Sequence, residues 1–248
     1  MPVMPPMVDI VIPVLNEEKA LPKCVAHLGE FLKAHLSYPY RIVIADNGST
    51  DQTPVVAEML SKQYRDVHWT RLEIRGRGRA LREAWLQSDA DILSYMDVDL
   101  STNLDAFPSL VQAIEGEGYD VAIGSRLMRG SVVRKRSFKR EVTSRSYNMI
   151  IKAIFFTRFS DAQCGFKAVS RDAAQFLIPK IQDQAWFFDS ELLILAEKSG
   201  LRIKDIPVEW TDDPDSRVRV IKTATEDLKG LLRLRLGGLS KALKSTQS

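Results

Sequence analysis

Two aspartates, Asp97 and Asp99, have the type and spacing that most directly suggest chemistry in this sequence. They follow an apolar run that starts at residue 92, and residues 89–105 contain five aspartates but no lysine or arginine. Carboxylates crowded in this way repel one another unless a hard cation lies between them. A divalent cation, Mg²⁺ or Mn²⁺, bridging to a nucleotide diphosphate would fill this role. The alternative is a strand that ends in a solvated acidic loop.

The apolar run before these aspartates predicts the element that positions them. If it forms an interior β-strand, residues two apart share a face, so Asp97 and Asp99 point to the same spot. That spot lies beyond the carboxyl end of the strand, where open α/β sheets bind their ligands. We therefore expect a ligand site at that end.

Strand and helix patterns alternate along the first half of the chain. Thr53 and Pro54 fit the N-cap and first residue of the second helix. The alternation predicts a doubly wound, mostly parallel sheet. Polar or glycine-containing loops follow the first four strands, and because the carboxyl ends of parallel strands meet at one edge, these loops should converge into a nucleotide site. The predicted strands lie at residues 8–15, 40–45, 67–72, from 92 and at 121–125, and the helices begin near residues 22, 54, 80 and 103.

The pattern changes after residue 131. Residues 139–159 are amphipathic, and residues 221–244 place leucines among basic residues, with the glycine pair at 237–238 weakening the helix. We divide the chain into an α/β domain at residues 1–220 and a basic, amphipathic C-terminal helix or tail at residues 221–248. Between them, the pattern predicts strands at 165–170 and 201–208 and a helix at 190–198.

Charge and composition exclude several classes of protein. The net charge of +3 gives no general affinity for nucleic acid, yet residues 126–145 hold eight basic side chains against Glu141 alone, and residues 217–244 hold eight against two acidic ones. No run approaches the roughly 18 apolar residues of a membrane span, and the N-terminus lacks a signal-peptide pattern. Cys24 and Cys164 have no metal-type spacing and are expected as reduced, buried thiols in a cytosolic protein. The histidines form no catalytic arrangement with serine or cysteine.

The segment at residues 75–79, Arg-Gly-Arg-Gly-Arg, is neither a P-loop nor a dinucleotide fingerprint, because its glycine spacing differs and no Gly-Lys-Ser/Thr follows. Its glycines would let the backbone approach a phosphate while its arginines supply charge. An exposed basic turn is the alternative. Asp46, after the second strand, also has an alternative role as a turn residue that bonds its own backbone.

Taken in order, these motifs resemble glycosyltransferase family 2, which has the GT-A fold, and most closely its dolichyl- or polyprenyl-phosphate sugar synthases. The resemblance covers residues 8–221. Four segments are typical of the family at large: Ile-Pro-Val-Leu-Asn-Glu-Glu (12–18), Ala-Asp-Asn-Gly-Ser-Thr-Asp (45–51), Asp-Val-Asp (97–99) and Gly-Ser-Arg (124–126). The narrower ones are Arg140-x-x-x-Ser144 with Asn148, Asp-Ala-Gln-Cys-Gly-Phe-Lys (161–167) and Phe-Phe-Asp-Ser-Glu (187–191). The Gln-Cys-Gly-Phe-Lys segment is most similar to the glucosyl-phosphodolichol branch.

The resemblance implies a role for each matching residue, with Asp46 accepting a hydrogen bond from the base. The residues implied to contact the nucleoside are Pro13, Asn16, Glu17 and Asp46, and those implied to bind the metal are Asp97 and Asp99. The donor phosphates would contact Arg126 and, from the 75–79 segment, Arg77, and the acceptor phosphate would contact Arg140 and Ser144. From the tail, Arg217 and Arg219 are implied to close over the site.

Two departures from the family pattern stand out. Asn47 lies where the family often has a second aspartate, and Arg77 and Arg79 lie where it usually has lysine and glycine. The charge survives at Arg77, whereas the bulk of Arg79 leaves the conformation of the loop open. Two other classes fit less well. A sugar-phosphate nucleotidyltransferase would need a glycine-rich basic loop after the first strand, and a non-catalytic nucleotide-binding subunit would be expected to lack the metal carboxylates.

The family implies an inverting displacement, in which the acceptor attacks the anomeric carbon as the nucleoside diphosphate leaves. A phosphate acceptor is already anionic near neutral pH, so no strong base is needed. We expect UDP-glucose as donor and a polyprenyl or dolichyl phosphate as acceptor; the alternatives are GDP-mannose, or a soluble or polysaccharide acceptor. A lipid acceptor implies peripheral association with the cytoplasmic face of a membrane through residues 139–159 and the tail. Core packing is the alternative explanation of the same apolar residues.

Overall fold

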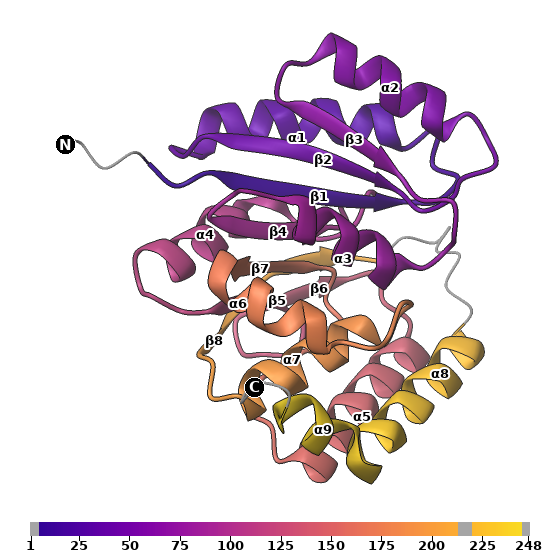
Figure 1. Cartoon of the computed structure of the whole chain (residues 1–248), viewed down its shortest axis with the longest axis vertical. Coiled ribbons are helices and arrows are strands. Elements are labelled where there is room, and N and C mark those ends of the chain that lie inside the picture. The colour runs from indigo at the N-terminus through magenta and orange to yellow at the C-terminus, as the bar shows by residue number, and fades with distance from the viewer. Residues whose placement is uncertain (1–4, 213–219, 245–248) are drawn as a thin grey trace.

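The computed structural model describes residues 5–212 and 220–244 of the chain (Figure 1). Strands and helices alternate through its first half, as the sequence predicts. In chain order the elements are β1 (Val8–Val14), α1 (Leu21–His35), β2 (Tyr40–Asp46), α2 (Thr53–Gln63), β3 (Val67–Arg71), α3 (Arg77–Gln87), β4 (Ile92–Met96), η1 (Leu104–Ala106), α4 (Phe107–Glu115), β5 (Val121–Ser125), β6 (Val132–Arg134), α5 (Phe138–Phe155), β7 (Phe166–Ser170), α6 (Arg171–Leu177), η2 (Ile178–Lys180), α7 (Phe188–Lys198), β8 (Ile203–Pro207), β9 (Glu209–Thr211), α8 (Val220–Arg233), η3 (Leu234–Gly238) and α9 (Leu239–Lys244).

Seven of the described strands form one sheet in the order β3-β2-β1-β4-β7-β5-β8. Parallel pairing joins β1 to β2 and β4, β2 to β3, and β5 to β8. The antiparallel strand β7 lies between β4 and β5, with Lys167 opposite Tyr95. The sheet is therefore mostly parallel, as predicted. The arrowheads of β1, β2 and β3 point to the same side of the molecule in Figure 1, so the loops after these strands share one edge.

Alternating side chains along the strands fill two hydrophobic clusters, one on each face of the sheet. In β4, Leu93 and Tyr95 pack into one cluster, and Ile92 and Met96 pack into the other. Helices α3, α5, α6, α7 and α8 contribute to the first cluster, and α1, α2 and α4 to the second. Burial on both faces explains why β1, β4 and β5 are mostly apolar in the sequence, whereas the edge strands β3 and β8 contain several polar residues.

The C-terminal helices pack against this α/β body. Leu231 of α8 and Ala242 of α9 are buried in the same cluster as α5 and α7. Arg233 donates two hydrogen bonds, of 3.0 and 2.7 Å, to the buried carboxylate of Glu191 in α7. The helix bends at η3, where Gly237 has φ of 122°, in agreement with the predicted weak point. The domain boundary after residue 220 stays a prediction.

Several local predictions differ from the structure. Thr53 is not the N-cap of α2 but its first residue, and its Oγ1 accepts a hydrogen bond from the backbone N–H of Glu17. Helix α3 begins at Arg77 rather than near residue 80, because backbone carbonyls of residues 184–185 accept hydrogen bonds from the first turn of this helix. The short elements α6, β6 and β9 were not predicted.

Candidate active site

Hydrogen bonds connect the loops that follow β1 and β2. The backbone N–H of Asn16 donates to Oγ of Ser49 at 2.9 Å, and that of Glu17 donates to Oγ1 of Thr53 at 2.7 Å. Asn16 has φ of 57°, and its Oδ1 accepts a hydrogen bond from the backbone N–H of Thr50 at 2.8 Å. Asparagine tolerates this left-handed conformation better than most residues. These hydrogen bonds therefore hold the two loops together at the edge of the sheet.

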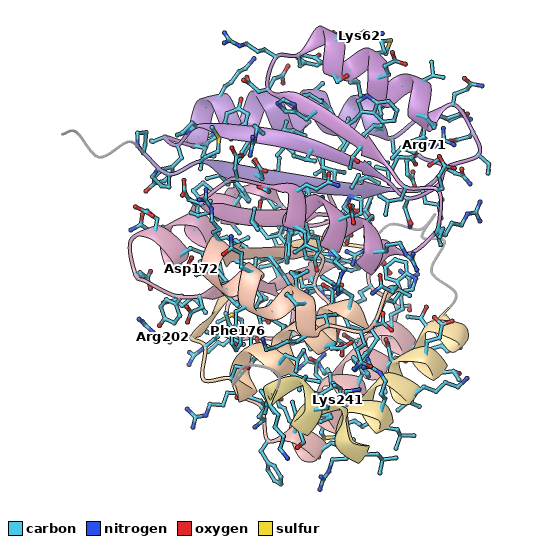
Figure 2. All side chains as sticks on the ribbon, in the orientation of Figure 1. Lys62, Arg71, Asp172, Phe176, Arg202 and Lys241 are labelled. Carbon is cyan, nitrogen blue, oxygen red and sulfur yellow. The ribbon has the colours of Figure 1, made fainter. Side chains whose placement is uncertain are left out.

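Asp46 ends β2 and is fully buried beside these loops. Its Oδ1 accepts a hydrogen bond from the backbone N–H of Ser49 at 3.1 Å, whereas its Oδ2 has no hydrogen-bond partner within the described chain. Nε of Arg71, a residue labelled in Figure 2, lies 3.7 Å from Oδ2, which is too long for a hydrogen bond. Pro13 of β1 lies opposite Ala45, next to this carboxylate in the sheet. A buried acceptor without a donor is unfavourable, so Oδ2 suits a donor on a ligand.

Asn47 connects the β2 loop to the β3 loop. Its Oδ1 accepts a hydrogen bond from the backbone N–H of Gly76 at 2.5 Å. A Cβ on Gly76 would lie 2.4 Å from the carbonyl oxygen of Gln184, so the close approach requires glycine. The side-chain oxygen of Asn47 accepts this hydrogen bond, so the contact does not require an aspartate at position 47. Arg79 donates its backbone N–H to the same carbonyl at 3.1 Å and lies in the first turn of α3, while its buried Nε has no hydrogen-bond partner among the described residues.

Arg77 bridges two acidic side chains. Its Nη2 donates to Oδ1 of Asp97 and its Nη1 donates to Oδ2 of Asp189, each at 2.7 Å. The guanidinium also lies over the rings of Tyr95 and Trp186, 5.0 and 5.1 Å from their centroids. Burial alone would lower the pKa of Arg77, but the charges of Asp97 and Asp189 outweigh burial and raise it. Arg77 therefore keeps its positive charge despite its burial.

Asp189 is the centre of a buried polar cluster behind this bridge. Its Oδ1 accepts hydrogen bonds from the hydroxyl of Tyr95 and from Nζ of Lys167, the latter at 3.0 Å. Lys167 is fully buried, and its Nζ also donates to the Tyr95 hydroxyl at 2.9 Å and to the carbonyl of Cys164 at 2.6 Å. Burial would raise the pKa of Asp189, but the charges of Lys167 and Arg77 lower it. The cluster thus holds a charged carboxylate that positions Arg77.

Asp99 lies on a turn and not on the strand. β4 ends at Met96, and the backbone N–H of Leu100 donates to the carbonyl of Asp97 at 3.2 Å. The prediction that Asp97 and Asp99 share a strand face is therefore wrong, because the strand ends before either of them. Both nevertheless line one small cavity of about 10 Å³, together with Gly165. That volume is about what one water molecule or one metal ion needs.

The two carboxylates fit a divalent cation that also binds phosphate. Mg²⁺ is commonly held by one or two carboxylates, with substrate phosphates and water completing its coordination. Within residues 5–212 and 220–244, no cluster of three or more His, Cys, Asp or Glu side chains is arranged to hold a metal ion. Asp97 and Asp99 would therefore hold a cation together with a phosphorylated substrate.

A larger cavity, of about 290 Å³, lies between the segment after β5 and helix α5. Arg126 lies on its wall and forms a two-point ion pair with the buried carboxylate of Asp161, at 2.7 and 3.0 Å. Burial would lower the pKa of Arg126, but Asp161 chiefly, and Asp97 to a smaller extent, raise it. Asp161, which holds Arg126, belongs to the same short segment as Gly165, which lies against Asp97. The cavity is lined by Arg126, Met128, Ser131, Val133, Arg136, Glu141 and Arg145.

Positive charge on the wall of this cavity is incompletely neutralised. The ring of Trp210 lies 5.5 Å from the guanidinium of Arg126 and 5.4 Å from that of Arg136. Arg136 is only 8% exposed; its Nη1 donates to Glu141 at 2.9 Å, and its Nε has no hydrogen-bond partner within the described chain. Burial and the charge of Arg126 lower the pKa of Arg136. An anion with several acceptor oxygens would complement this wall.

Arg140 and Ser144, which the resemblance assigns to the acceptor phosphate, lie one turn apart on α5. Neither belongs to the lining of the larger cavity. The guanidinium of Arg140 is paired with Asp212, and Oγ of the buried Ser144 has no hydrogen-bond partner in the described ranges. The structure thus brings Arg77, Asp97 and Asp99 together but leaves Arg140 in another contact. Arg217 and Arg219 lie outside the described residues.

No role was predicted from the sequence for Asp189, Lys167 or Trp186. The first two belong to motifs quoted above, and one signal could have identified them. A lysine inside the apolar strand pattern Phe-Lys-Ala-Val needs a buried counter-ion, since an unpaired buried charge is strongly unfavourable. The acidic partner had to come from another segment.

α5 and the tail also carry exposed apolar side chains. On α5, exposed apolar side chains recur at spacings of four and seven residues, so they lie along one stripe of the helix. In the tail they recur at spacings of four residues and form a second stripe. None of the described helices combines the length and apolarity needed to cross a bilayer. Tyr147, Ile151 and Phe155 of the predicted amphipathic segment belong to the core. The exposed residues with these spacings are Phe138, Val142, Met149 and Phe156 in and directly after α5, and Leu228, Leu232 and Leu236 in the tail; Ile150 of α5 is also exposed.

Comparisons with known proteins identify the family of the chain. The profile of the family described as Glycosyl transferase family 2 matches residues 9–177. Glycosyltransferase AglD of Haloferax volcanii is 34% identical over 217 residues, which cover 87% of this chain and 35% of AglD. The chain therefore spans about a third of that relative's length.

Two further relatives match over most of their length. The dolichyl-phosphate beta-glucosyltransferase of Dictyostelium discoideum is 28% identical over 239 residues, covering 92% of this chain and 73% of the relative. The human protein of the same name is 27% identical over 253 residues, covering 97% and 78%.

Among solved structures, glucosyl-3-phosphoglycerate synthase of Mycobacterium tuberculosis, in complex with Mn²⁺, UDP-glucose and phosphoglyceric acid, superposes with a TM-score of 0.71. The alignment covers 94% of this chain and 80% of the synthase at 16% sequence identity. This likeness establishes the fold alone, and the fold is the GT-A fold that the sequence predicted.

Proposed function

Because the chain belongs to glycosyl transferase family 2, we propose that it transfers a hexose from a nucleotide sugar to the phosphate of a polyprenyl or dolichyl lipid. The observation that carries the proposal is the position of two complementary sites. Asp97 and Asp99 form a cation-sized cavity at the edge of the sheet. The segment of residues 161–165 connects it to a basic cavity of about 290 Å³ beside α5, because Asp161 holds Arg126 on the wall of the larger cavity and Gly165 lies against Asp97. The first site suits a diphosphate with its cation, and the second suits a phosphate acceptor.

On the donor side, the loops after β1 and β2 would hold the nucleoside. Pro13, Asn16 and Glu17 border the buried Asp46, whose Oδ2 would accept a hydrogen bond from the base. Arg77 would face the diphosphate, since it already lies beside Asp97.

On the acceptor side, the basic cavity would receive the phosphate. Arg136 and Arg145 on its wall supply charge, and Arg126 would lie between the two phosphorylated substrates. Arg140 and Ser144 directly precede the cavity residues Glu141 and Arg145 on α5, and Arg140 would reach the phosphate by leaving Asp212.

The reaction forms a bond between an acceptor phosphate oxygen and the anomeric carbon, and it breaks the bond between that carbon and the nucleoside diphosphate. Attack opposite the leaving group inverts the anomeric configuration. When bound, the divalent cation supplies charge neutralisation at the leaving diphosphate. Arg77 and Arg126 add positive charge on either side. The acceptor phosphate is already anionic, so no side chain has to remove a proton.

UDP-glucose is the proposed donor. The support is the similarity to dolichyl-phosphate beta-glucosyltransferases and the Gln-Cys-Gly-Phe-Lys segment at residues 163–167. In the structure this segment supplies Gly165, which lies against Asp97, and the buried Lys167. GDP-mannose is the competing donor.

The lipid acceptor would require the protein to bind a membrane surface. The apolar stripes of α5 and the tail lie among basic side chains such as Lys152 and Lys241, the latter labelled in Figure 2. Such a combination suits the interface of an anionic bilayer. Cys24 and Cys164 are buried free thiols, which agrees with the proposed location on the cytoplasmic face.

The test is incubation with radiolabelled UDP-glucose or GDP-mannose and polyprenyl phosphate in the presence of Mg²⁺ or Mn²⁺, followed by lipid extraction. Label from UDP-glucose should enter the lipid fraction. Label entering only from GDP-mannose would overturn the choice of donor, and label remaining in a water-soluble product would overturn the choice of acceptor.

A further inference from the structure

The carboxylate of Asp97 is already engaged before any cation arrives. Its Oδ1 accepts a hydrogen bond from Nη2 of Arg77 at 2.7 Å, and its other oxygen lies against the backbone of Gly165. The cavity that Asp97 shares with Asp99 lies directly beside this ion pair. A cation entering this cavity therefore meets a carboxylate that is held by an arginine.

The local charges make Arg77 and an incoming cation compete for Asp97. Arg77 and Lys167 together balance Asp97 and Asp189, so the four side chains carry no net charge. A divalent cation bound to Asp97 would bring two further positive charges close to the guanidinium, and like charges at such separations repel. Arg77 must therefore weaken cation binding for as long as it remains on Asp97.

The surroundings of Arg77 provide for its release. Nη1 is held by Asp189, whose other oxygen is held by Tyr95 and Lys167. The rings of Tyr95 and Trp186 lie 5.0 and 5.1 Å from the guanidinium and would keep its plane in place. Loss of the Asp97 contact would leave these other contacts intact and free one edge of the guanidinium.

We propose that Arg77 is a positioning counter-ion that Asp97 exchanges for the divalent cation, while Asp189 retains Arg77 beside the site so that its released edge binds the diphosphate. The inference rests on the proposed cation and nucleotide site but not on the identity of the sugar or acceptor. Arg77 then makes cation and nucleotide binding cooperative: it opposes the cation when the nucleotide is absent and contacts the nucleotide once the cation is bound. Such coupling is reciprocal.

The experiment measures Mn²⁺ binding from the electron paramagnetic resonance signal of free Mn²⁺, with and without UDP and, in parallel, GDP. The proteins are wild type, Arg77→Gln, Arg77→Lys and Arg75→Gln. Arg77→Gln should bind Mn²⁺ alone at least about 5-fold more tightly than wild type. The nucleotide should tighten Mn²⁺ binding in every protein, because its phosphates also bind the cation, but the tightening should be at least about 3-fold larger in wild type than in Arg77→Gln. Arg77→Lys should lie between them, because lysine keeps the charge but cannot bridge two carboxylates in the same way.

Arg75→Gln is the matched control, because it removes the same charge from an exposed position in the same loop. It should change Mn²⁺ affinity by less than about 2-fold. Unchanged or weaker Mn²⁺ binding by Arg77→Gln, or equal tightening by Arg75→Gln, would overturn the proposal. If Arg77→Gln does not fold, Arg77→Lys carries the same comparison, and it overturns the proposal if it binds Mn²⁺ alone no more tightly than wild type. Failure of the proposed function would show separately, as absent transfer to lipid with this binding pattern intact.

Discussion

Gly165 and Asp97 are in direct contact: a Cβ on Gly165 would lie 1.8 Å from Oδ2 of Asp97, and the backbone N–H of Asp97 donates to the carbonyl of Gly165 at 3.3 Å. The antiparallel strand β7 begins directly after Gly165 and pairs with β4, which ends directly before Asp97. The strand pairing thus places glycine backbone against the proposed metal ligand.

Gly165→Ala should reduce transfer by about 100-fold or more, because the new methyl group must displace the Asp97 carboxylate. Steady-state kinetics and Mn²⁺ binding should both show the loss. Gly29→Ala is the control: Gly29 lies in α1, where an added methyl group would meet no atom within 4 Å, so activity should be retained and stability should change by no more than about 1 kcal/mol. Full activity in Gly165→Ala would contradict the proposed role of Asp97.

Asp97→Asn and Asp99→Asn should each lower transfer by on the order of 100-fold or more, since neutral amides bind a divalent cation poorly. Excess EDTA should silence the wild-type protein. Thermal unfolding should change little, because the Asp97 side chain is 44% exposed and asparagine keeps an acceptor for Arg77. Activity that persists in excess EDTA would rule out the metal site.

Arg140→Ala should raise the KM for polyprenyl phosphate about 10- to 100-fold, equivalent to about 1.5–3 kcal/mol for a charge-assisted contact. Nucleotide binding by calorimetry should stay unchanged, and Arg140→Lys should recover only part of the effect. Arg136→Gln is the companion variant. If it raises this KM while Arg140→Ala does not, the cavity wall holds the phosphate and Arg140 serves only its ion pair with Asp212.

Asp227→Asn should stabilise the protein at high pH. Burial chiefly, with the charges of Asp183, Asp189 and Glu226, raises the pKa of Asp227 to about 7 from its ordinary value of 3.8, against the hydrogen bond from Gln163. The folded protein therefore holds this proton at pH values where the unfolded chain has lost it. For this group, stability is full below pH 3.8 and falls as the pH rises toward 7.

At pH 8 the Asn variant should gain on the order of 2–4 kcal/mol in the free energy of unfolding, and the gain should shrink as the pH falls toward 4. Urea unfolding at pH 8 and pH 5 measures the difference. Glu58→Gln on the exposed face of α2 should show no such dependence. A gain of the same size at both pH values would mean that Asp227 is not protonated in the folded protein.

Leu232→Glu and Met149→Glu should weaken binding to anionic phospholipid vesicles, each by about 5-fold or more, because each apolar side chain contributes through its buried area. Flotation of vesicles with bound protein measures the change. Met59→Glu on α2, which is 52% exposed and far from both stripes in the chain, is the matched control. Equal loss in Met59→Glu would mean that the stripes of α5 and the tail are not the binding surface.

Local patterns were sufficient for the strands that carry the donor site. The apolar runs before Asn16, Asp46 and Asp97 predicted β1, β2 and β4 closely, because burial on both faces of a parallel sheet requires such runs. The same reasoning failed at Asp99, where the chain leaves the strand. Short elements such as β6 and β9 also escaped prediction, since strands of three residues leave too little periodicity to recognise.

The sequence by itself determined the alternation of strands and helices, the mostly parallel sheet and the edge at which the polar loops meet, because side-chain periodicity and strand direction are local properties. Only the tertiary structure decided which charges neutralise one another. Arg77 and Asp189 are 112 residues apart yet share an ion pair, and Lys167 reaches the same carboxylate from β7. Those contacts depend on the strand order β4-β7-β5, and this order follows from global packing and not from any local stretch of the chain.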